Sequence, residues 1–204
     1  MRIRRWCASR RSRATTSIGT RSRFEVDLNR PRDKAVYVTP EDAWGLQVWN
    51  EELPAEVIAE SLGEYDAFYA RMQEILDAKV AKYGRFVLFD LHTYNHRRQG
   101  PDGPAADLDL NPQVNIGTGT LNRDRWGSVI DRFISDLTDF DFPGGALDVR
   151  ENVKFRGGNV PRWVHENYPE TGCAIAIDFK KFFMNEWTGE PDASLVDAIG
   201  SSLN

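Results

Sequence analysis

The sequence has 204 residues, of which 41% are hydrophobic, 28% are charged and 11% are aromatic. This composition is typical of one folded globular domain and excludes an intrinsically disordered chain. No apolar run approaches the roughly 20 residues of a membrane-spanning helix, so we expect no membrane span. Cys7 and Cys173 have no metal-type spacing. We therefore expect no structural disulfide and a reducing, cytoplasmic environment.

The net charge of −5 is unevenly distributed along the chain. The first thirteen residues contain six arginines and no acid, and without them the remainder carries −11. An acidic body does not suit a nucleic-acid-binding protein, which needs a basic face. The arginine-rich segment is either a functional arm or transit-like peptide, or the product of a start site or reading frame that does not belong to the fold. We favour the second interpretation and place residues 1–20 outside a single domain that spans residues 21–204.

The first half of the chain has the patterns of a short strand, a helical region and a buried strand. Residues 24–29 read as the short strand, and a proline-containing loop follows. Apolar residues recur at helical spacing over residues 54–83, with Gly63 as a candidate break and Gly84 as the end. The continuous apolar run within residues 85–92 predicts a strand that is buried on both faces, as in a parallel sheet.

The second half begins with a polar segment, residues 95–122, that is rich in Gly, Pro, Asp and Asn. Long irregular segments of this kind are often functional. The patterns after it predict helices over 124–138, 160–169 and 193–199, and strands over 147–153 and 173–179. Helices that alternate with buried strands predict a three-layer α/β/α domain.

The most informative motif is DLHTYNHRR, where a buried strand ends and a polar loop begins. Ligands of open α/β sheets bind beyond the carboxyl ends of strands, so His92 stands where an imidazole could reach a metal or a substrate. Asp90, two residues earlier, lies on the same side of the strand and could orient an imidazole. The alternative is that His92 is a hydrogen-bonded strand-end histidine, and that His96 faces water or caps the loop.

A second motif, SRFEVDLNR, places Asn29 and Arg30 at a strand-to-loop transition. A guanidinium can grip a carboxylate with two hydrogen bonds, and the Asn29 amide can donate to the same anion. The alternative is that Arg30 forms a surface ion pair with one of the many acids of the chain.

A third motif, AIAIDFKKFFMNEW, contains Asp178 inside an apolar strand. A carboxylate in that position is paired, bound to a metal or placed at the edge of the sheet where a site forms. Asp178 could act as a general base on a metal-bound water. The alternative is an ion pair with Lys180, Lys181 or an arginine. We interpret Glu186 as a surface acid and His165 as a helix-surface histidine.

Five segments, in order from about Ser22 to Gly189, resemble the N-formylglutamate amidohydrolase family. The segments are SRFEVDLNR, VLFDLHTYNHRR, NPQVNIGTGT, the glycine pair ahead of Arg162–His165, and CAIAIDFKKFFMNEWTG. The resemblance implies a fold similar to zinc carboxypeptidases and aspartoacylases, with a mixed sheet between helices. It also implies zinc as the cofactor and hydrolysis of the amide bond of a small N-acyl amino acid, such as N-formylglutamate.

The resemblance also implies roles for individual residues. His92 would be a zinc ligand, while Asn29 and Arg30 would hold the substrate carboxylate. His96 and Arg97 are further substrate-binding candidates because they place polar groups near His92. Asp178 stands where the family usually has its catalytic glutamate, although its side chain is one methylene shorter. In zinc hydrolases the metal lowers the pKa of bound water, and such a carboxylate takes the proton.

The sequence departs from the family near its start. A histidine-bearing motif and an acidic residue complete the zinc site in the family, whereas no His, Asp or Glu precedes Ser22 here. We therefore expect a member that lacks its first strand or strands, and an exposed sheet edge that lowers soluble expression. The two candidate functions are a zinc amidohydrolase impaired by this loss and a catalytically inactive carboxylate-binding protein of the same fold. The sequence predicts no oligomeric state.

Overall fold

A computed structural model of the chain describes residues 15–203, so the arginine-rich start and Cys7 lie outside the described residues. The chain divides into two compact units, Met1–Ile75 and Leu76–Asn204. Between residues 15 and 203, no helix combines the length and the hydropathy that crossing a bilayer requires.

The first unit contains turns where we predicted a strand over residues 24–29. The prediction was wrong because side chains and local carbonyls bind the backbone donors that a sheet would use. The Phe24 amide donates to the Ser22 hydroxyl at 3.2 Å, and the Asn29 amide donates to the Asp27 carboxylate at 3.0 Å. The Arg30 amide donates to the Asp27 carbonyl at 3.2 Å and closes a turn.

Helix α1, Ala55–Tyr83, is continuous through Gly63, so the predicted break is absent. Gly84 ends the helix with a φ of +76°, a conformation that favours glycine. Within the first unit, the hydroxyls of Tyr65 and Tyr69 donate to backbone carbonyls of residues 30 and 28, at 3.0 and 2.7 Å. These bonds hold the turns of that unit on the amino-terminal part of α1.

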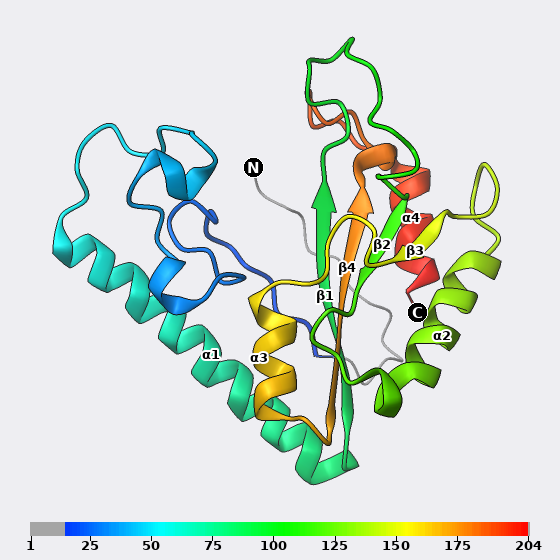
Figure 1. Cartoon of the computed structure of the whole chain (residues 1–204), viewed down its shortest axis with the longest axis horizontal. Helices are drawn as coiled ribbons and strands as arrows, with labels where there is room; N and C mark the ends of the chain where they lie inside the picture. The colour runs from blue at the N-terminus through cyan, green and yellow to red at the C-terminus, as the bar shows by residue number, and fades with distance from the viewer. Residues whose placement is uncertain (1–14, 204) are drawn as a thin grey trace. The chain divides into compact units, whose positions relative to one another are not determined.

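The second unit is built on a four-stranded sheet in the order β1-β4-β2-β3 (Figure 1). The strands are β1 (Phe86–Tyr94), β2 (Val114–Gly117), β3 (Val149–Glu151) and β4 (Gly172–Lys180). Pairing is parallel between β1 and β4 and between β2 and β3, and antiparallel between β2 and β4. The predicted mixed sheet is therefore confirmed.

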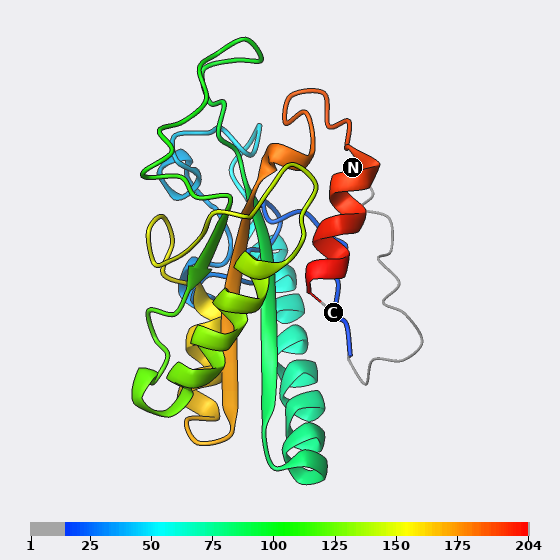
Figure 2. The ribbon, with the colours of Figure 1, turned by 90° about the vertical axis from the view of Figure 1, so that its right-hand side faces the viewer.

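Helices cover both faces of this sheet, and Figure 2 shows helices in front of and behind the strands. Helices α2 (Arg123–Asp139) and α4 (Ala193–Ser202) pack on the face that carries the apolar, odd-numbered residues of β4. Helix α3 (Asn159–Asn167) lies on the opposite face, where Val164 approaches Gly172. The apolar core therefore occupies one face, and the other keeps room for polar groups between small residues of β4.

Strand β1 is not buried on both faces, contrary to our prediction. Val87, Phe89 and Leu91 are 48%, 41% and 56% exposed. Within the described residues, β1 pairs with β4 alone and forms one edge of the sheet. A continuous apolar run is thus also compatible with an edge strand whose other face carries Asp90 and His92.

Strand β2 lies inside residues 95–122, which we predicted to be irregular. Its four residues, VNIG, are too few to show a period and include two residues that are uncommon in strands. These residues form a strand because they pair with β4, where Ile116 lies opposite Ile177 in the apolar core.

Replacing Gly117 with alanine should lower the free energy of unfolding by about 1–3 kcal/mol through overpacking. A Cβ atom at Gly117 would lie 2.6 Å from the Gly157 backbone nitrogen and 2.9 Å from the Arg156 carbonyl carbon. The matched variant is Gly63→Ala, because that Cβ meets nothing within 4 Å on an exposed helical site. There the change should raise stability by up to about 1 kcal/mol. Urea unfolding measures both effects, and equal signs would contradict the described packing.

Candidate active site

Three polar side chains form a row across neighbouring strands on the face opposite the apolar core. His92 of β1 is the register partner of Asp178 of β4, and Asn115 of β2 lies opposite Asp178 on its other side. Register partners carry their side chains on the same face of a sheet. The structure therefore brings together two residues that the sequence nominated separately, His92 and Asp178, and adds Asn115.

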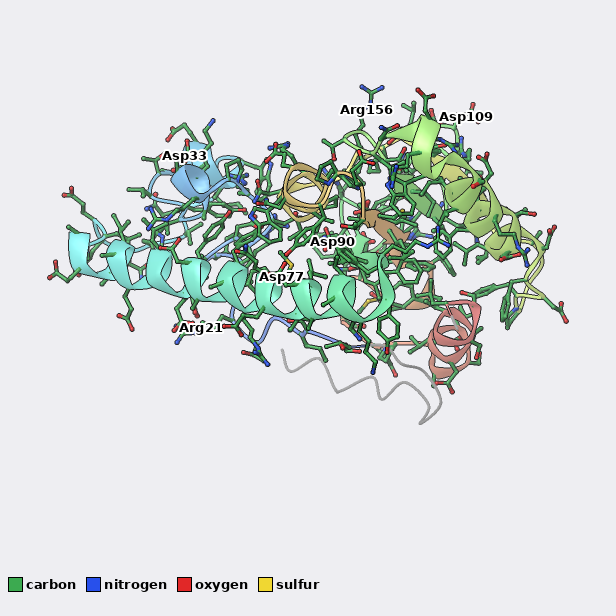
Figure 3. All side chains as sticks on the ribbon, turned by 90° about the horizontal axis from the view of Figure 1, so that it is seen from below. Arg21, Asp33, Asp77, Asp90, Asp109 and Arg156 are labelled. Atoms are coloured by element: carbon green, nitrogen blue, oxygen red, sulfur yellow. The ribbon has the colours of Figure 1, made fainter. Side chains whose placement is uncertain are left out.

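Asp90 holds the imidazole of His92. The Nε2 atom of His92 lies 2.9 Å from Oδ1 of Asp90, and the His92 side chain is 36% exposed. Figure 3 shows Asp90 projecting from β1. A carboxylate at this distance fixes the orientation of the ring and favours the tautomer with hydrogen on Nε2.

Burial raises the pKa of Asp178 to about 6. The residue is only 8% exposed. Asp90 raises the pKa further through repulsion, whereas His92 and the Asn115 amide oppose the shift. A carboxyl group with a pKa near 6 is largely ionised at neutral pH and is a stronger base than an ordinary aspartate, which suits general base catalysis.

Asn115 is completely buried and joins Asp178 to the segment that follows β3. Its Oδ1 accepts hydrogen bonds from the backbone amides of Lys154 and Phe155, at 2.9 and 3.3 Å. The amide orientation is thereby fixed, and Nδ2 donates to the Phe155 carbonyl at 2.9 Å and faces Asp178 at 3.5 Å. Sequence reasoning missed this residue, although a polar residue between Val114 and Ile116 was a usable signal.

His96 and Arg97 lie in the segment that follows β1, and the Glu186 carboxylate binds both of their backbone amides. These three residues help to line a cavity of about 500 Å³. Burial lowers the pKa of His96, although Glu186 opposes this. The prediction that Glu186 is a surface acid was wrong, because its side chain is only 2% exposed.

The prediction of a helix-surface role for His165 was also wrong. Its Nε2 accepts a hydrogen bond from the Ala174 backbone amide at 3.2 Å, and its Nδ1 lies 2.8 Å from the Thr120 hydroxyl. Pairing between β2 and β4 ends at Ala176, so His165 satisfies an amide of β4 beyond the end of β2. Burial lowers the pKa of this histidine and favours the neutral ring, which indicates a structural role.

Asn29 and Arg30 belong to the first unit, whereas the row around Asp178 belongs to the second. The Arg30 guanidinium donates to the Asp42 carbonyl at 2.9 Å and lies over the Tyr37 ring at 4.4 Å. Arg30 also approaches the Asp27 carboxylate at 3.8 Å. The assignment of Asn29 and Arg30 to a substrate carboxylate stays a prediction.

The described residues do not fit a complete catalytic zinc site. Residues 15–203 contain no group of three or more His, Cys, Asp or Glu side chains placed to hold a metal ion. A catalytic zinc ion usually takes three protein ligands. The Asp90–His92 pair has the arrangement that accompanies one histidine ligand, but these residues do not supply the rest.

The family model described as N-formylglutamate amidohydrolase matches residues 4–183 of the chain. The match begins inside residues 1–20, and the boundary that we placed there stays a prediction. A comparison with curated protein sequences finds no significant match.

The solved structures that are similar to this chain include the following two. One is N-formylglutamate amidohydrolase from Ralstonia eutropha JMP134, with a TM-score of 0.63 and 13% identity over 89% of this chain and 70% of that chain. The other is the gene product Atu2144 from Agrobacterium tumefaciens, with a TM-score of 0.53 and 18% identity over 89% of this chain and 69% of that chain. At these identities the similarity shows the fold, which agrees with the family match.

Replacing Asp178 with asparagine should stabilise the folded chain at pH 8. The pKa of Asp178 rises from an ordinary value of 3.8 to about 6 in the folded chain, so the charged form costs stability. The cost is small below pH 4, grows between pH 4 and pH 6, and levels off above pH 6 at about 3 kcal/mol. Thermal unfolding of both proteins at pH 4 and pH 8 measures it, and equal melting temperatures at pH 8 would contradict the shift.

Proposed function

Because the chain belongs to the N-formylglutamate amidohydrolase family, we propose that it hydrolyses the amide bond of a small N-acyl amino acid, such as N-formylglutamate. One observation carries the proposal: buried Asp178 lies opposite His92 on neighbouring strands, and its pKa is raised to about 6. The fold and the family support an amidohydrolase, and the site adds a base beside a held imidazole. The substrate is a soluble small molecule rather than a nucleic acid.

In the proposed reaction, Asp178 takes a proton from a water molecule while the water oxygen attacks the acyl carbonyl carbon. The carbon–nitrogen bond then breaks, and the proton passes from Asp178 to the leaving nitrogen, which releases the acid and the free amino acid. Asp90 keeps the His92 ring in place, so that its Nδ1 lone pair can orient the same water. Asn115 holds Asp178 from the opposite side.

The cavity lined by His96 and Arg97 is the proposed place for the rest of the substrate. The cavity residues follow β1 and β4 in the sequence, and these loops rise beyond the carboxyl ends of both strands (Figures 1 and 2). Ligands bind at that end of open α/β sheets. A carboxylate on the amino acid would meet the Arg97 guanidinium, a donor that suits such groups.

Replacing Asp178 with asparagine should reduce kcat for N-formylglutamate hydrolysis by at least about 100-fold, the usual loss when a general base is removed. The matched control is Asp136→Asn on α2, where the carboxylate is 57% exposed and pairs with Arg132. That variant should keep its activity. Formate release measures both variants with N-formylglutamate, and release of the free amino acid follows the comparison substrates N-acetylglutamate and N-formylalanine. Equal activity in the two variants would exclude Asp178 as the base.

Zinc binding also stays a proposal, with His92 as one ligand. Because one imidazole and nearby carboxylates do not make a three-ligand set, we expect bound zinc to be removed by dialysis against a chelator. His92→Ala should prevent reloading, which elemental analysis can follow. One zinc ion per chain that survives the chelator would contradict this expectation.

The alternative is an inactive protein of the same fold that binds carboxylates. It is favoured by the incomplete metal-ligand set within residues 15–203. Calorimetric titration with N-formylglutamate separates the two functions. Binding without formate release supports the alternative, whereas release of formate excludes it.

A further inference from the structure

We propose that Glu186 is a positioning residue that fixes one wall of the substrate cavity. This inference rests on the proposed function and assigns a role to a side chain that does not join the row around Asp178. Both carboxylate oxygens of Glu186 are used: Oε2 accepts from the His96 amide at 2.8 Å, and Oε1 accepts from the Arg97 amide at 2.6 Å. Glu186 therefore binds two consecutive amides from a segment about 90 residues away in the sequence.

A neighbouring hydrogen bond strengthens the same connection. The Trp187 indole Nε1 donates to the Arg97 carbonyl at 3.0 Å. Three hydrogen bonds thus join the segment that follows β4 to the segment that follows β1, and all three reach the backbone of His96 or Arg97. Because these bonds reach backbone atoms, they fix the path of the chain at His96 and Arg97 independently of their side-chain conformations. This wall of the cavity is therefore held in one place.

The attachment lies at the base of a closed loop. The Ala106 amide donates to the His96 carbonyl at 2.9 Å and closes the loop of residues 96–106 at His96, whose own amide Glu186 binds. Inside the loop, the Arg97 guanidinium donates to the Gly103 carbonyl at 2.8 Å. Without Glu186, this loop would keep its internal bonds but lose its main attachment to the segment after β4.

The burial of Glu186 makes this attachment specific for a carboxylate. Its side chain is 2% exposed, and a buried carboxylate needs donors to offset its lost hydration. A glutamine in place of Glu186 has one acceptor oxygen, and its NH₂ group cannot accept from the second backbone amide. An alanine in that position has no side-chain acceptor. A charged acceptor forms stronger hydrogen bonds than a neutral one, so the two replacements should release the loop to different degrees.

The expected consequence is weaker substrate binding rather than slower chemistry. Arg97, Asp102 and Trp187 line the cavity together with Glu186, whereas Asp178 is held by β4 and Asn115. A mobile wall must be ordered again each time a ligand binds, which costs affinity. The kcat value depends on Asp178 and should change little.

The test compares Glu186→Gln and Glu186→Ala with Glu190→Ala, an exposed glutamate of the same segment. Hydrogen exchange at the His96 and Arg97 amides reports the attachment without any need for activity. Exchange should be faster in Glu186→Gln than in wild type, faster still in Glu186→Ala, and unchanged in Glu190→Ala. Unchanged exchange in Glu186→Ala would overturn the attachment.

The second measurement is KM and kcat for N-formylglutamate. Glu186→Ala should raise KM about tenfold, equivalent to about 1.4 kcal/mol, while kcat stays within about twofold. Glu186→Gln should rescue part of this loss. An unchanged KM, or a fall in kcat alone, would overturn the role of Glu186 in substrate binding. A wild-type chain that neither binds nor hydrolyses N-formylglutamate would overturn the proposed function, and with it the role of Glu186 in substrate binding. The hydrogen-exchange result would still decide whether Glu186 holds the His96 and Arg97 backbone.

Discussion

The parallel pairing of β1 with β4 is the constraint on which the rest of the site depends. The two strands pair over nine consecutive residues, and this register sets His92 opposite Asp178. The antiparallel pairing of β2 with β4 then sets Asn115 on the other side of Asp178. Because side chains alternate along a strand, a slip of one residue would turn Asp178 into the apolar core. The apolar residues on the other face of β4 therefore secure the position of the carboxylate.

One face of β4 packs in the apolar core, and the opposite face carries the candidate catalytic residue Asp178. Cys173, Ile175 and Ile177 are completely buried in the core with α2 and α4. On the opposite face, Ala174 and Ala176 leave room beside Asp178. This arrangement explains why an acid can sit near the end of an apolar strand. The core stabilises the sheet, and the energetic cost of burying Asp178 appears as a raised pKa, which is also what a general base requires.

The sequence predicted the sheet-and-helix framework because α1 and α2 carry apolar residues at helical spacing and β4 carries a continuous apolar run. It nominated His92 from its place at a strand end and Asp178 as an acid inside an apolar strand, and the register of β1 and β4 sets the two opposite each other. Their roles stay predictions. The predicted strand at residues 24–29 failed because Ser22 and Asp27 bind the local backbone. Asn115 offered a local signal as a polar residue between two apolar ones, but its contact with Asp178 joins segments far apart in the sequence. The burial of Glu186 depends on distant segments in the same way, and no local pattern encodes such contacts.

A double-mutant cycle between His92 and Asp178 tests the central claim most directly. The cycle compares kcat/KM for N-formylglutamate in wild type, His92→Gln, Asp178→Asn and the double variant. If both residues serve one reacting water, the double variant will be little worse than the more damaged single variant. If the two losses simply multiply, the residues act independently and the shared reaction centre is contradicted.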